Sequence, residues 1–165
     1  MSDRMPFTIF HLGPALLLGM LLFNYVNLPA LLLSSVIMDL EPLAVLLLGL
    51  KYPAHGFFHS FLGGTVVGVL VFFIMTALDR RVQKLMSLLK LEQKYSRRSI
   101  LLACLLGVYS HTLLDSSLGY YDIQPLFPFP GNPFYIQTTT GVYLFCTLSF
   151  ILGAALWIKR IKSFR

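Results

Sequence analysis

Residues 100–115 read ILLACLLGVYSHTLLD, an apolar run that follows the Arg97-Arg98 pair and carries no charge before its end. In a stretch of about 20 residues, this composition predicts a membrane-spanning helix. His111 and Asp115 are four residues apart, so they share one face of that helix. Ionisable groups are costly at membrane depth and normally face partners in the protein interior. We therefore expect the rest of the chain to bring partners to His111 and Asp115.

The chain as a whole is too apolar for a soluble domain. Of its 165 residues, 56% are hydrophobic and 12% are charged, and the mean hydropathy is +0.75. Soluble domains carry about 25% charged residues. The net charge of +6 would suit nucleic acid, but the basic residues form two blocks that flank apolar spans, as membrane topology requires. We predict a single all-α domain over residues 1–165, a polytopic helical membrane bundle in the lipid bilayer with no nucleic-acid partner.

Five membrane spans are expected, over about residues 7–26, 28–50, 61–78, 99–118 and 140–158. The first is expected to be retained, because it lacks the small-residue cleavage site of a signal peptide. The second is interrupted by Asp39-Leu40-Glu41-Pro42. Proline removes a backbone donor and disfavours helix in the residue before it, so this helix is predicted to kink or break there. A break at membrane depth is tolerated only against protein or a water-filled cavity.

Two longer connections set the predicted topology. Residues 79–98 carry seven Lys or Arg and two acids, with apolar residues at roughly helical spacing, which predicts an amphipathic helix on the membrane surface. Residues 119–139 contain four prolines, which predicts an irregular loop on the membrane surface or over the site as a lid. The basic bias places residues 79–98 and the C-terminus in the cytoplasm, and residues 119–139 outside the cell membrane. The site near the outer span ends is then expected to face the extracytoplasmic side.

Every histidine of the chain falls near a span end or in one short loop, and acids accompany them. Imidazole with carboxylate oxygen suits zinc, manganese or iron, and a shared site could hold one or two ions. No cysteine joins the set, which favours an open hydrolytic zinc site over a closed structural one. The predicted metal ligands are His11, Asp39, His55, His59, His111 and Asp115.

Taken singly, each of these residues could play a different part. His11 could be a polar residue at the membrane interface. Asp39 and Glu41 beside Pro42 could belong to an ion or proton transporter, because broken helices also mark transporter sites. His111 and Asp115 could form a self-satisfied hydrogen-bonded pair. The convergence of the whole set from four segments favours the metal site.

The motifs resemble those of a family of LexA-regulated inner-membrane proteins described as metal-dependent hydrolases. The match covers about residues 6–130 and consists of His11 and Gly13, then Asp39, Glu41 and Pro42, then His55, His59 and Ser60, then Ser110, His111, Leu113 and Asp115, followed by Pro125, Pro128 and Phe129. The family often has Asp at the position of Glu41, and Arg at the position of Gly56, where it would offer a phosphate-binding cation. The order of the metal-competent residues is also distantly similar to that of zinc-dependent phospholipase C, which implies phosphoester hydrolysis.

The sequence therefore predicts a membrane-embedded metal-dependent hydrolase. A metal-bound water of lowered pKa would attack an ester or phosphoester. Glu41 is the expected general base, and Asp39 is expected to ligate one metal or to bridge two. The position of the site in the bilayer suggests a lipid or another amphiphile as substrate. The alternatives are a metal-ion or proton-coupled transporter and a structural membrane protein with a stabilising metal.

Overall fold

The computed structural model describes residues 10–118, 122–136 and 139–163, and these residues form an all-helical structure without strands. The all-α prediction is confirmed for this part of the chain. The elements in order are α1 (Leu12–Leu21), α2 (Leu28–Ile37), α3 (Leu40–Leu48), the 3₁₀ turn η2 (Phe57–His59), α4 (Phe61–Ala77), α5 (Asp79–Leu88), α6 (Arg97–Leu118) and α7 (Thr139–Ser163).

Three helical segments are long and apolar enough to cross a membrane, namely Leu28–Leu48, Arg97–Leu118 and Thr139–Lys162. A fourth follows if α4 and α5, which meet at a bend of 76°, count as one span. Their outer faces carry exposed large apolar side chains such as Leu47 and Phe73, and apolar surface of this kind suits contact with lipid. The helices are thus compatible with membrane insertion, and the five-span count stays a prediction.

The first predicted span is a shorter helix than expected. Within residues 7–26, the described helix α1 covers only Leu12–Leu21, and residues 1–9 lie outside the described part of the chain. The chain turns after α1, where the N–H groups of Tyr25 and Val26 donate to the Leu22 carbonyl at 2.8 and 3.0 Å. Asn27 then caps the next helix, its side-chain oxygen accepting the Ala30 N–H at 2.9 Å. Pro29 stands in the first turn of α2, where its missing N–H costs nothing.

The predicted break in the second span is confirmed. Helix α2 ends at Ile37 and α3 begins at Leu40, with Asp39 at the N-terminal cap of α3. Pro42 is buried in the first turn of α3, where it cannot donate the hydrogen bond that would continue α2. The break places Asp39 and Glu41 beside the site instead of along a continuous lipid-facing helix, with Asp39 next to His111 and Glu41 next to His59.

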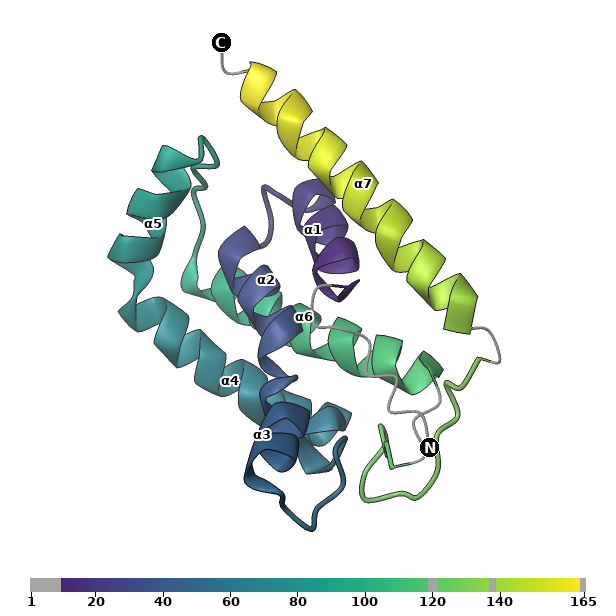
Figure 1. Cartoon of the computed structure of the whole chain (residues 1–165). Helices are drawn as coiled ribbons and strands as arrows, with labels where there is room; N and C mark the ends of the chain where they lie inside the picture. The colour runs from purple at the N-terminus through teal and green to yellow at the C-terminus, as the bar shows by residue number, and fades with distance from the viewer. Residues whose placement is uncertain (1–9, 119–121, 137–138, 164–165) are drawn as a thin grey trace.

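Helix α6 runs through the middle of the molecule, in contact with α2 and α4, while α1 packs on α7 (Figure 1). The approach of α2 is close because α6 has a glycine at the contact. A Cβ on Gly107 would lie 2.5 Å from Ser34 Cβ and 2.7 Å from the Leu31 carbonyl oxygen. This proximity brings the backbone of α2 to the side chain of His111, one turn farther along α6.

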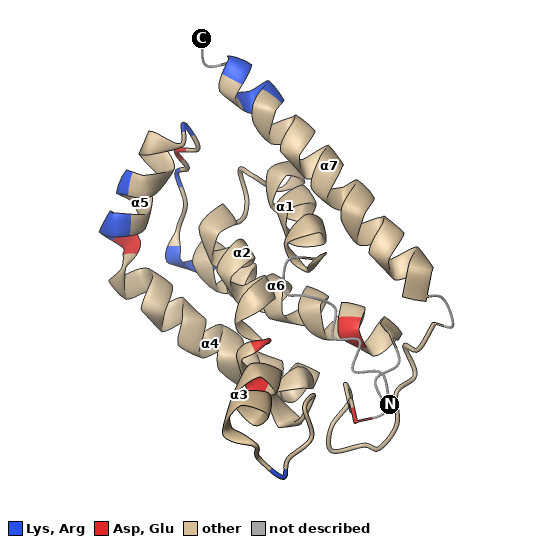
Figure 2. Cartoon of the chain, viewed as in Figure 1, with Lys and Arg blue, Asp and Glu red and all other residues tan. Residues whose placement is uncertain are grey.

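The basic segment 79–98 is helical over Asp79–Leu88 and again from Arg97, where α6 begins. Helix α5 ends at Leu88, and the chain then runs without regular structure to α6. Gln93 fixes this connection to the turn between α1 and α2. Its oxygen accepts the Leu28 N–H, and its amide nitrogen donates to the carbonyls of Phe23 and Val26, at distances of 2.6–2.9 Å. Figure 2 shows that most of the basic residues lie at the end of the bundle away from the acids of α3 and α6.

Candidate metal centre

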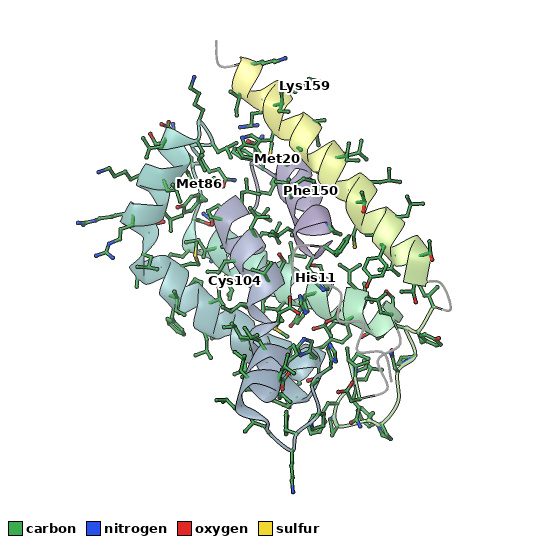
Figure 3. All side chains as sticks on the ribbon, viewed as in Figure 1. His11, Met20, Met86, Cys104, Phe150 and Lys159 are labelled. Carbon is green, nitrogen blue, oxygen red and sulfur yellow. The ribbon has the colours of Figure 1, made fainter. Side chains whose placement is uncertain are left out.

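The structure brings all six predicted metal ligands together around Asp115. They form two groups. Within each group the ligand atoms lie within 4.8 Å of one another, and Asp115 belongs to both groups. The first group contains His11, Asp39, His111 and Asp115, and the second contains His55, His59 and Asp115. All are buried except Asp39, whose side chain is 19% exposed. Figure 3 shows His11 at the end of α1 that lies against α6.

The first group is carried by helices and helix ends. His111 Nε2 lies 3.0 Å from Asp115 Oδ2 and 3.7 Å from Asp39 Oδ1. His11 Nε2 lies 3.3 Å from Asp115 Oδ1, and its ring stacks on that of His111 with 3.9 Å between centroids. Two imidazole nitrogens and two carboxylates therefore face one small volume beside the break between α2 and α3.

The second group adds ligands from the segment between α3 and α4. His59 Nε2 lies 3.6 Å from Asp115 Oδ2. The rings of His55 and His59 meet edge to face with 4.9 Å between centroids. Asp115 Oδ2 thus faces both His111 and His59, which makes Asp115 the residue common to the two groups.

Two histidines have their Nδ1 atoms fixed by a partner. The Nδ1–H of His111 donates to the Ser35 carbonyl of α2 at 2.7 Å. The Nδ1–H of His59 donates to Glu41 Oε2, also at 2.7 Å. A partner on one ring nitrogen sets the tautomer and leaves the other nitrogen for a metal. In both rings the remaining Nε2 points to Asp115.

The chemistry of these side chains fits a divalent cation. Both nitrogens of His11, the Nε2 atoms of His59 and His111, Asp39 Oδ2 and Asp115 Oδ1 are buried and make no well-directed hydrogen bond, although the imidazole Nε2 atoms face carboxylate oxygens at 3.0–3.7 Å. A buried polar atom left unpaired costs about 1–3 kcal/mol. Here the unpaired atoms are of the kinds that bind zinc and related ions, with an N/O donor set and no cysteine in either group. The two groups could therefore hold a metal ion, and the donor set alone does not single out zinc.

Asp122 is a site residue that the sequence did not reveal. Its Oδ2 accepts the backbone N–H of His55 at 3.0 Å, and its Oδ1 lies 3.4 Å from His55 Nδ1. Burial alone would raise the pKa of the Asp122 carboxyl, but the hydrogen bond from the His55 backbone N–H, together with the adjacent His55 ring, outweighs it, and the pKa is lowered. Burial lowers the pKa of His55, which favours the neutral imidazole that a metal requires. The only sequence signal was that Asp122 is the single charge in residues 119–139.

A cavity of about 170 Å³ lies next to the second group. Its wall includes Tyr52, Phe57, Phe127 and Asp122, and no Lys or Arg of the described residues belongs to it. The ring of Tyr52 occupies the space that a side chain at residue 56 would need, so Gly56 suits this position. The family that the sequence motifs resemble often has an arginine at the position of Gly56, which would offer a cation. In this chain the cavity wall beside Gly56 is aromatic instead.

Comparison of this chain with protein-family models, with curated proteins and with solved structures gives no match. The likeness to the LexA-regulated family consequently rests on the sequence motifs.

Proposed function

We propose that this protein is a membrane-embedded metal-dependent hydrolase that acts on an ester or phosphoester of a lipid or another amphiphile. The main observation in support is that Asp115 is shared by two histidine-containing groups, and that each group includes buried ligand atoms without a hydrogen-bond partner. Open hydrolytic sites use nitrogen and oxygen ligands of this kind. The cavity shares Asp122 with the surroundings of His55, and it would be the place for a substrate headgroup near the second group.

Each residue has a distinct part in this proposal. His11, His111 and Asp115 with Asp39 would hold one ion, and His55 and His59 with Asp115 a second one. A bound divalent ion would lower the pKa of water and polarise the substrate oxygen.

Two carboxylates, those of Glu41 and Asp39, are candidates for the general base. Glu41 Oε2 is engaged by His59 Nδ1, and its Oε1 lies 3.4 Å from the Phe58 N–H that donates to it. Asp39 Oδ1 faces His111 in the first group, whereas its Oδ2 is buried without a hydrogen-bond partner and is left to accept a proton. A base must be able to accept a proton from water within hydrogen-bond reach. We therefore assign the proton-accepting role to Asp39 and an orienting role to Glu41.

The transporter alternative has one observation in its favour, the helix break beside Asp39. Against it, an apolar cluster with Leu31, Val71 and Ala103 fills the interior between α2, α4 and α6. The hydroxyls of Ser34 and Ser35 donate to carbonyls of their own helix, at 2.6 and 2.9 Å. A transported ion would have to pass this apolar layer, so the hydrolase is the better proposal.

Metal-dependent turnover is the expected property of the purified wild-type protein. Protein in detergent is stripped with a chelator, reloaded with zinc, manganese or iron, and assayed on chromogenic esters and phosphoesters with acyl chains. We expect hydrolysis only after reloading, because the ligands must hold an ion before water is activated. Proteoliposomes loaded with a metal-sensitive dye provide the contrast. Metal uptake without hydrolysis would contradict the proposal and support the transporter.

The site is proposed to open on the extracytoplasmic side. In Figure 2 the Lys and Arg gather around α5 and the C-terminal part of α7, while the acids of α3 and α6 lie toward the opposite end of the bundle. Positive residues are enriched on the cytoplasmic side of membrane proteins. Lys51, in the loop after α3, is the exception within the described residues on the site side.

Cysteine labelling tests this orientation. Phe129→Cys, in the loop after α6, is expected to react in intact cells with a membrane-impermeant thiol reagent. Ser87→Cys in α5 is expected to react only after permeabilisation. Both positions are exposed, whereas the native Cys104 and Cys146 are buried, so the unmodified protein supplies the background. The reverse pattern would overturn the orientation.

A further inference from the structure

We propose that the two groups bind metal with unequal affinity, and that Asp122 completes the second group by positioning His55. The first group would hold its ion tightly, and the second would hold an exchangeable ion through a histidine that the loop after α6 keeps in place. This inference rests on the proposed metal-dependent function.

The first group is built on packed helices. His111 and Asp115 lie within α6, and Asp39 and His11 stand at the N-terminal ends of α3 and α1. The close contact at Gly107 holds α2 on α6, and the Ser35 carbonyl then fixes the His111 ring. These ligands are therefore in place before any ion binds, and such preorganisation lowers the cost of binding.

The second group depends on a chain segment with little regular structure. His55 lies between α3 and η2, and His59 ends the single turn η2. Within this segment the Tyr52 hydroxyl accepts the Phe57 N–H at 2.9 Å, and the Gly56 carbonyl accepts the His59 N–H at 3.1 Å. Short connections of this kind open locally more easily than packed helices.

Asp122 holds His55 in place from outside this segment. One carboxylate contacts both the backbone N–H and the ring Nδ1 side of the same residue, His55, from a position 67 residues later in the chain. Contact with both parts sets the placement of the backbone and the orientation of the imidazole together. Groups that orient a metal-ligating histidine typically account for about 10–100-fold in metal affinity.

The loop that carries Asp122 is tied down independently of His55. The Pro125 carbonyl accepts the Phe61 N–H at 2.9 Å, and the Asn132 amide donates to the Ser116 carbonyl at 2.7 Å. The loop therefore keeps anchors to α4 and α6 when Asp122 is changed. This separation allows positioning of His55 to be distinguished from attachment of the loop.

The test is a zinc titration of the chelator-stripped full-length protein in detergent, followed by competition with a chromogenic chelator. For the wild type we expect two zinc ions in two affinity steps. Asp122→Asn is expected to weaken the second step by about 10–100-fold, leave the first unchanged, and still reach two ions at saturating zinc. Asp122→Glu should recover part of the affinity. With cobalt in place of zinc, the visible spectrum of the second equivalent should change and that of the first should not.

Asn132→Ala is the matched control, because it loosens the same loop without touching His55. An equal loss of the second step in Asn132→Ala would overturn the positioning role and leave only loop attachment. An unchanged second step in Asp122→Asn would also overturn the positioning role. If Asp122→Asn instead fails to bind a second ion even at saturating zinc, Asp122 is a metal ligand and the positioning role is again wrong. A wild type with one ion would refute the inequality of two sites while leaving the hydrolase intact. A wild type with no zinc would refute both proposals.

Discussion

Asp115→Ala is expected to lose all bound metal, whereas loss of any single histidine affects one group. Both groups use the Asp115 carboxylate, with His11 on Oδ1 and with His59 and His111 on Oδ2. Removal of this shared anion takes a ligand from both groups and leaves buried imidazoles without the charge that balances the ions. Elemental analysis of the purified variant should show near-zero metal, and turnover should fall to the uncatalysed rate.

The control for this variant is Ser116→Ala, in the same helix and equally buried. The Ser116 hydroxyl donates to the Thr112 carbonyl of its own helix at 2.6 Å and belongs to neither metal group. We expect this variant to keep full metal content. His111→Ala combined with Asp115→Ala should be no worse than Asp115→Ala alone, because residues that act as one unit are not additive. Full metal occupancy in Asp115→Ala would refute the centre as described.

The proximity of these side chains could be predicted because ionisable residues are rare in apolar spans. A histidine or aspartate placed inside such a run is costly unless it has partners, so His111 and Asp115 indicate a site that the other histidines complete. The break of the second span was also predictable, since Pro42 cannot continue the helix. These inferences depend on local chemistry and need no knowledge of the packing.

The relations within the centre could not be predicted from spacing. Asp39 was expected to ligate one metal or to bridge two, and it falls in one group only, whereas Asp115 is common to both because it lies between His11 and His59. Ser35 reaches His111 only through the close contact at Gly107. Asp122 was equally hidden, since the loop after α6 folds back over 67 residues of sequence to meet His55.

The length of the first helix was missed for a different reason. Residues 7–26 are apolar enough to suggest one continuous span, and hydropathy says little about where a turn begins. In the structure α1 ends at Leu21, and Asn27 begins the next helix by capping it. Capping is a short-range hydrogen-bond effect that an apolar average conceals.

Glu41→Gln and Asp39→Asn are expected to differ in a way that identifies the general base. Glu41 was the base expected from sequence, but its Oε2 is 2.7 Å from His59 Nδ1. Glutamine keeps an oxygen that can accept this bond, so Glu41→Gln should lower metal affinity by about 10–100-fold, and excess metal should restore most of the turnover. Asp39→Asn removes the unpaired Oδ2 and leaves a neutral amide that cannot take a proton from water. Its rate at saturating metal should fall by about 10²–10⁴-fold.

Measurement of turnover as a function of metal concentration separates the two roles, because added metal can compensate for weak binding and cannot replace a base. Metal content determined on the same samples shows whether Asp39→Asn keeps its ions despite the lost charge. If Glu41→Gln stays about 10²–10⁴-fold slower at saturating metal while Asp39→Asn recovers, Glu41 is the base and Asp39 only a ligand. In that case Glu41 would accept the proton of the water itself, and the orienting role drawn from its 2.7 Å contact with His59 would be wrong.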